Sequence, residues 1–118
     1  METNFSGAEP IFLQMASAIK AEIISGELLP GEKLKSVRDF SSEFKANPNT
    51  VQKALFELEK IGLIYTDRTN GKFVTNNHDI ISCVKEDIFK QKSKDFLDEM
   101  KKMGLSKDDV IDLIKKGE

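Results

Sequence analysis

Four polar side chains lie within one short stretch of the chain, namely Asn49, Thr50, Gln52 and Lys53. The amides of Asn and Gln can each form two hydrogen bonds with the edge of an adenine, and Lys and Thr suit phosphate oxygens. Arg38, a little earlier, can hold a guanine edge or a phosphate with two parallel hydrogen bonds. These residue types could therefore read a nucleic acid, provided that the surrounding elements present them together.

The stretch that carries the four residues has the signals of a short helix. Asn47 is a favourable N-cap, and Pro48 fits the first helical position, where a missing N–H costs nothing. Apolar residues at helical spacing predict one buried stripe, formed by Val51, Ala54, Leu55 and Leu58. Gly62 ends the helix. The polar residues lie outside this stripe, and Phe56 is also off it, where we expect the ring to pack against a neighbouring element.

A helix before this one and a hairpin after it complete a motif. Ser36, with Asp39 three residues later, predicts a capping box and a helix that ends near Ala46. Its predicted buried residues are Val37, Phe40 and Phe44. Residues 63–66 and 72–75 predict two strands joined at Asn70-Gly71. Two short helices and a hairpin predict a winged helix-turn-helix, with the third helix in a major groove and the hairpin beside it on the backbone.

The rest of the chain divides around this motif. Residues 1–9 predict a flexible arm, and a helix from Pro10 to about Ser25 opens a winged domain that spans residues 10–75. Residues 33–35 predict a short strand that pairs with the hairpin. Residues 76–79 are polar and predict a linker, and residues 80–118 predict a tail of two amphipathic helices. Ser106, with Asp109 three residues later, predicts a second capping box at the start of the last helix. The fold class is mainly α with a small β component.

The long tail helix carries an apolar stripe that predicts an interface, formed by Ile81, Val84, Ile88, Phe89, Phe96 and Met100. A pair of helices below about 40 residues rarely folds without outside help. The stripe could pack on the chain's own winged domain or on a second copy. We expect a homodimer, because a symmetric pair also supplies the second half of a DNA site.

The composition of the whole chain is compatible with a DNA-binding protein but does not by itself indicate one. The chain has 118 residues and a formal charge of −2, but residues 33–53 carry five basic against two acidic side chains, a local charge of +3. A single cysteine allows no internal disulfide and is compatible with a reducing cytosol. No apolar run approaches the roughly 20 residues that span a bilayer, and no signal peptide is apparent. We expect a cytoplasmic protein that does not contact membranes.

Catalysis is the first rival function, and the residues do not favour it. His78 is the sole histidine and lies in the polar linker, and no motif pairs it with Cys83 or with a carboxylate. There is no glycine-rich phosphate loop and no metal-ligand spacing. The sequence therefore predicts no enzyme activity, no metal site and no cofactor.

Placed in this way, the chain resembles the GntR family of bacterial transcription regulators, most closely the short-tailed YtrA-like subfamily. The resemblance rests on residues 10–14, 25–34, 36–38, 47–54, 58–65 and 71–74. It implies a sequence-specific regulator, a repressor, that binds a palindromic operator in double-stranded DNA as a homodimer; it assigns no effector. The two-helix tail agrees with the small dimerisation region of that subfamily.

The resemblance and the chemistry of the residues together give a predicted DNA-contacting set: Lys35, Ser36, Arg38, Asn47, Asn49, Thr50, Gln52, Lys53, Arg68, Thr69, Asn70, Gly71 and Lys72. Two members depart from the family pattern. Lys35 stands where the family usually has Pro, and Lys72 stands where it often has Thr, so both add a positive charge near the proposed DNA face. The alternative function is a winged helix that binds proteins only. Such a module would favour apolar or acidic groups on the third helix, and this one has amide and basic groups.

Overall fold

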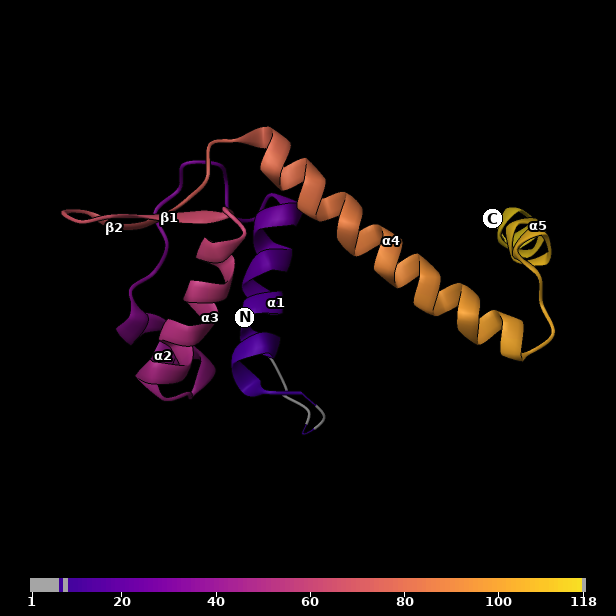
Figure 1. Cartoon of the computed structure of the whole chain (residues 1–118), viewed down its shortest axis with the longest axis horizontal. Coiled ribbons are helices and arrows are strands. Elements are labelled where there is room, and N and C mark those ends of the chain that lie inside the picture. The colour runs from indigo at the N-terminus through magenta and orange to yellow at the C-terminus, as the bar shows by residue number, and fades with distance from the viewer. Residues whose placement is uncertain (1–6, 8, 118) are drawn as a thin grey trace. The chain divides into compact units, whose positions relative to one another are not determined.

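The computed structural model describes residue 7 and residues 9–117, so most of the predicted N-terminal arm lies outside the described residues. Within that part of the chain, the elements follow one another as α1 (Ile11–Ser25), α2 (Val37–Phe44), α3 (Pro48–Lys60), β1 (Ile64–Asp67), β2 (Gly71–Val74), α4 (His78–Lys102) and α5 (Lys107–Gly117) (Figure 1). The chain forms two compact units that divide within α4, one ending at Ser82 and the other beginning at Cys83. The mainly helical fold with a small sheet confirms the predicted winged helix-turn-helix with C-terminal helices.

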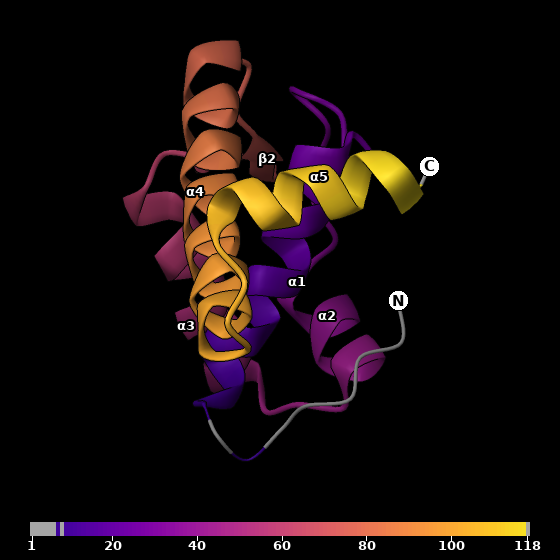
Figure 2. The same cartoon turned by 90° about the vertical axis from the view of Figure 1, so that its right-hand side faces the viewer.

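The first unit is built on the packing of α1 against α3, which lie side by side (Figures 1 and 2). Each helix has apolar residues three or four positions apart, which gives one buried face. The buried residues of α1 are Met15, Ala16, Ile19 and Ile23, and those of α3 are Val51, Ala54, Leu55 and Leu58. Figure 1 shows α2 at the end of the unit where α1 and α3 begin. The predicted stripe of the third helix is thus confirmed.

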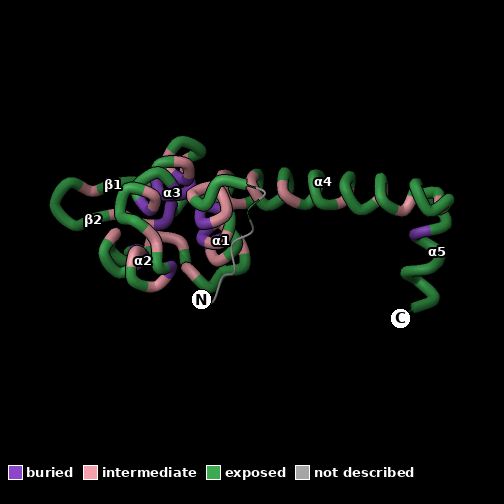
Figure 3. The backbone as a smooth tube through the Cα atoms, turned by 90° about the horizontal axis from the view of Figure 1, so that it is seen from below, coloured by how far each residue is buried: buried purple, intermediate pink, exposed green. Residues whose placement is uncertain are grey.

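The core of the first unit also includes residues of the loops and strands. Leu34 before α2, Leu63 and Ile64 around β1, and Val74 at the end of β2 are all buried. Figure 3 shows the buried residues gathered around α1 and α3, while α4 contains only intermediate and exposed residues. This core positions α2, α3 and the hairpin as one body.

α2 begins with the predicted capping box. The Asp39 N–H donates to Ser36 Oγ at 3.0 Å, and the Ser36 N–H donates to the Asp39 carboxylate at 3.4 Å. Phe40 and Phe44 are buried, but Val37 is only half-buried, so the expectation for Val37 was wrong. Val37 is the first residue of the helix and lines a surface pocket instead of the core.

The helix also ends earlier than the predicted Ala46, because Lys45 takes a left-handed conformation with a φ of 54°. Its backbone N–H donates to the Ser41 carbonyl and closes the last turn. The connection to α3 is therefore a tight one.

β1 and β2 pair antiparallel, with Ile64 opposite Val74 and Asp67 opposite Gly71. The predicted two-residue turn at Asn70-Gly71 was wrong, because Gly71 belongs to the strand and residues 68–70 form the tip. The predicted strand at residues 33–35 is reduced to an isolated bridge between Lys33 and Phe73. The Leu34 N–H still donates to the Lys72 carbonyl at 2.9 Å and holds this segment against the hairpin.

α4 begins at His78, two residues before the expected Ile80, because the Asn77 side chain caps it by accepting from the Asp79 N–H at 3.0 Å. In the second unit, α5 begins with the predicted capping box. Ser106 Oγ accepts from the Asp109 N–H at 3.1 Å, and Asp109 accepts from the Ser106 N–H at 2.9 Å. Only Val110 is buried within α5.

Candidate nucleic-acid interface

The polar front of α3 is held in place by its cap. Asn47 Oδ1 accepts from the Asn49 N–H at 2.8 Å, and the Asn47 carbonyl accepts from the Thr50 and Val51 N–H groups. The Asn47 side chain thus satisfies a helix N–H that would otherwise need a partner. This cap fixes the first turn of α3 and so the direction in which Asn49 and Gln52 leave the helix.

Three of the four polar residues of this stretch are exposed. Asn49, Gln52 and Lys53 lie on the side of α3 away from its buried stripe, and Thr50 is half-buried. The Lys53 ammonium lies 5.9 Å from the centre of the Phe12 ring, so Lys53 leans toward α1. Among the described residues, the side-chain amides of Asn49 and Gln52 have no hydrogen-bond partner, so their exposed groups can meet the edges of bases.

Phe56 occupies the same exposed face, one turn later. Its side chain is 58% exposed, and the Lys60 ammonium lies 5.4 Å from the centre of its ring. The expectation that Phe56 packs against a neighbouring element was wrong. The residue lies opposite the core stripe, with Lys60 of its own helix over its ring.

Arg38 is the second residue of α2 and is exposed. The Ser36 capping box fixes the start of this helix and so the base of the arginine side chain. Among the described residues, Arg38 forms no ion pair and remains available to a phosphate or a base edge.

The tip of the wing is organised by the Asp67 carboxylate. Oδ1 accepts from the backbone N–H groups of Thr69 at 2.9 Å and Asn70 at 3.2 Å, and Oδ2 accepts from the Asn70 side chain at 3.3 Å. The bond from the Thr69 N–H, with those from Asn70, holds the pKa of Asp67 below its usual range. Gly71 follows with a φ of 105°, a conformation that favours glycine. Arg68 and Thr69 stay exposed at the tip.

Two predicted DNA-contacting lysines are ion-paired within the chain. Lys35 Nζ lies 2.6 Å from Glu43 Oε2, and Lys72 Nζ lies 3.8 Å from Glu59 Oε1. The bond to Glu43 raises the pKa of Lys35 and lowers that of the glutamate. Both lysines stand at the departures from the family pattern. Their carboxylate partners were missed, because neither pair has a short, regular spacing. Lys35 and Glu43 are eight residues apart across the start of α2, and Lys72 and Glu59 lie on different elements.

The structure adds two observations, one on metal binding and one on membrane-spanning helices. Within the described part of the chain, no three His, Cys, Asp or Glu side chains come together as a metal site would require. Its helices include none that is long and apolar enough to cross a membrane.

Comparisons with known proteins agree with this geometry. The family model of the bacterial regulatory proteins of the gntR family matches residues 13–74, which is more than half of the chain. The chain belongs to the GntR family. It is a DNA-binding transcription regulator of the winged helix-turn-helix type, and the resemblance drawn from its motifs is confirmed.

Individual GntR relatives match to different extents. An uncharacterised HTH-type transcriptional regulator, YhcF of Bacillus subtilis, is 36% identical over 98% of this chain and 95% of its own length. The HTH-type transcriptional repressor YtrA of the same organism is 43% identical over 58% of this chain and 52% of its own length.

Solved structures match as well. A GntR family transcriptional regulator from Listeria monocytogenes has a TM-score of 0.88 and 38% identity, over 95% of this chain and 98% of its own. AraR(DBD) in complex with operator ORX1 has a TM-score of 0.59 and 28% identity, over 64% of this chain and 96% of its own. The first match extends through the two-helix tail, and the second is confined to about the length of the winged domain.

Proposed function

We propose that this GntR regulator binds a palindromic operator as a homodimer and represses transcription there. The observation that carries the proposal is the exposed amide face of α3, where Asn49 and Gln52 lie outside the buried stripe and the Asn47 cap fixes the first turn of the helix. The operator complex of the similar AraR(DBD) supports duplex DNA as the partner. The name of the similar YtrA, a repressor, supports the direction of regulation. This function places the protein in the cytoplasm.

In the proposed complex, the first turns of α3 enter a major groove. Asn49 and Gln52 read base edges, and Arg38 at the start of α2 holds a guanine edge or a phosphate. Thr50 and Lys53, at the flanks of the face, contact phosphates. The side chain of Asn47 is engaged in its cap, so its contribution is mainly to hold the first turn. The wing lies along the backbone, with Arg68, Thr69 and Asn70 at its tip.

The homodimer is proposed to form through the second unit. Phe89 is 68% exposed and Phe96 is 43% exposed on α4, and further exposed apolar residues follow. These are Met103, Ile111, Leu113 and Ile114. Burying a large apolar side chain contributes about 1.5–3 kcal/mol, so covering these exposed side chains would stabilise the second unit. A second copy offers the same apolar surface and brings a second α3 to the DNA.

The winged domain (residues 10–75) and the tail (residues 80–118) thus have separate tasks in the proposal. The first reads DNA and the second joins two copies. The first apolar residues of the long tail helix are half-buried, namely Ile81, Val84 and Ile88. Phe89 and Phe96 are exposed, so they have the most side-chain area for a second copy to bury and are the proposed anchors.

The test compares Gln52→Ala and Asn49→Ala with the wild type on a panel of single-base variants of a duplex obtained by selection. Loss of one bidentate base contact removes about 1–3 kcal/mol of discrimination, so each variant should lose roughly 5- to 150-fold preference at particular base pairs. Gln91→Ala is the matched control, since Gln91 is an exposed glutamine of α4. If the variants kept the base preferences of the wild type, the proposed role of the α3 face would be wrong.

A further inference from the structure

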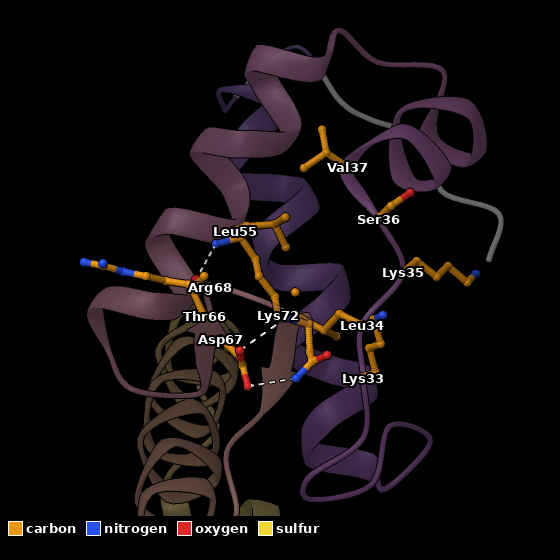
Figure 4. A pocket seen from close by; sticks show the side chains of 12 residues that line it. Lys33, Leu34, Lys35, Ser36, Val37, Leu55, Thr66, Asp67, Arg68 and Lys72 are labelled. Carbon is orange, nitrogen blue, oxygen red and sulfur yellow. Dashed lines mark hydrogen bonds between the residues drawn. The ribbon is translucent and has the colours of Figure 1, made fainter.

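A groove separates the wing from the segment that leads into α2. It has a volume of about 370 Å³ and is lined by residues 33–37, Leu55 and residues of the hairpin (Figure 4). Leu34 and Leu55 are buried at its base. Four basic residues contribute to its lining, namely Lys33, Lys35, Arg68 and Lys72. The positions of their charged ends decide which of them can meet an anion.

Two of the four charges are already neutralised. Figure 4 shows the Lys72 side chain turned back toward Thr66, to which its ammonium donates at 2.7 Å. Glu59 completes this network as the ion-pair partner of Lys72. The Lys35 side chain points away from the groove in Figure 4 and pairs with Glu43. Either lysine would have to leave a carboxylate before it could serve a phosphate, and that carboxylate would then repel the phosphate.

Lys33 differs from both. It is exposed, and within the part of the chain that the structure describes it has no ion-pair partner. Its backbone bridges to Phe73 of the wing, and a Cβ placed on Gly71 would lie 3.4 Å from Lys33 Cε. The aliphatic part of Lys33 therefore runs across the wing glycine, and its full charge stands at the edge of the groove.

Arg68 supplies a second free cation on the opposite side of the wing. Its side chain extends away from the groove in Figure 4, and among the described residues it too lacks an ion pair. Lys33 and Arg68 thus stand on either side of the wing. In the complex proposed above the wing lies along the DNA backbone, where either cation can meet a phosphate.

We propose that Lys33 is a phosphate-binding residue of the DNA interface, paired across the wing with Arg68, and that Lys35 and Lys72 chiefly hold the fold. This inference rests on the proposed function and assigns its electrostatic part to particular residues. Each phosphate neutralised by a free cation releases counterions and contributes about −0.9 to the slope of log K against log salt. A cation already paired with a carboxylate in the free protein contributes less, because the pair must exchange.

The experiment measures binding of the full chain to a fluorescent duplex over a salt series, by anisotropy. Lys33→Gln should reduce the magnitude of the slope by about 0.9 per subunit, and Lys33→Arg should restore it. Lys72→Gln should change the slope by less than half of that amount. Lys92→Gln removes an exposed lysine of α4 as the matched control and should leave the slope unchanged. Circular dichroism checks that each variant is folded.

The outcomes separate this inference from the proposed function. If the wild type fails to bind duplex DNA at low salt, the proposed function is wrong, and the inference falls with it. If the wild type binds with a steep salt dependence and Lys33→Gln behaves like Lys92→Gln, only the role of Lys33 is overturned. A larger loss of slope in Lys72→Gln than in Lys33→Gln would also overturn it.

Discussion

Lys72 in the wing and Glu59 near the end of α3 form an ion pair, with Nζ 3.8 Å from Oε1. Thr66 of β1 joins the two: it accepts from Lys72 at 2.7 Å and donates to the Glu59 carboxylate. The two charged side chains are 24% and 34% exposed. The wing is therefore tied by side chains, as well as by the backbone, to the helix proposed to read bases.

Glu59→Gln should separate the structural and electrostatic parts of this link. Partly exposed ion pairs contribute little, so the free energy of unfolding should fall by less than about 1 kcal/mol in urea titration. The released Lys72 should then be free for phosphate, and the slope of log K against log salt should steepen by up to about 0.9 per subunit. An unchanged slope would show that Lys72 is not withheld from DNA by Glu59.

The pair between Lys35 and Glu43 predicts a pH dependence of stability. The hydrogen bond from Lys35 holds the pKa of Glu43 below its usual range. Because the pKa of Glu43 is lower in the folded than in the unfolded protein, the ionised carboxylate stabilises the fold above the unfolded pKa, about 4.3. This contribution is lost as the pH falls through the folded pKa. Glu43→Gln should therefore be less stable than the wild type at neutral pH, by less than about 1 kcal/mol because Lys35 is largely exposed.

The same comparison has an internal check. The difference in unfolding free energy between wild type and Glu43→Gln should vanish in acid, and Lys35→Gln should show the same convergence. At alkaline pH the raised pKa of Lys35 keeps the pair charged until the pH passes that value. A difference that stays constant from neutral to acidic pH would contradict the ionic origin of the contribution.

Ser36→Ala and Ser106→Ala form a matched pair, since each serine caps a helix through the same reciprocal hydrogen bonds. Loss of an N-cap costs about 1 kcal/mol. Ser36→Ala should speed amide hydrogen exchange in α2, and Ser106→Ala should do so in α5, each leaving the other helix unchanged. Uniform acceleration of exchange across both units in either variant would mean that the caps do not act locally.

Phe89→Asp combined with Phe96→Asp should convert the proposed dimer into a folded monomer. Both side chains are exposed in the single chain, so the substitutions leave no buried charge unless a second copy covers them. Gln91→Asp, on another side of α4, is the control and should stay dimeric. Sedimentation equilibrium decides the matter. A wild type that is monomeric at micromolar concentration, or a double variant that remains dimeric, would place the proposal in error.

Local signals in the sequence predicted the parts of the fold that local physics decides. The Ser36 and Ser106 capping boxes and the Asn47 cap depend on residues within one turn, and each is present. The stripe of α3 follows from helical spacing alone. For Lys33, in contrast, the sequence predicted only a place in a short strand. Its position beside Gly71 depends on how the hairpin lies against residues 33–36, which no local signal indicates.

Local signals also did not predict the geometry of the wing or the ion pair that it forms. Asn70-Gly71 is a common two-residue turn, but the Asp67 carboxylate binds two N–H groups of the tip and favours a three-residue connection. The pairing of Lys72 with Glu59 follows only once strand register has set which side of the hairpin faces α3. Strand register is set only in the folded sheet, so the sequence alone did not show that Lys72, a predicted DNA contact, is already ion-paired with Glu59.

Operator recognition by a homodimer is tested by selecting binding sites from random duplexes with the purified wild-type protein. We expect the retained duplexes to share two inverted half-sites at a fixed spacing, because two copies of α3 related by a two-fold axis read the DNA. Binding to the resulting palindrome should be far tighter than to a single half-site. Retained duplexes without a shared sequence, or with an isolated half-site bound as tightly as the palindrome, would contradict it.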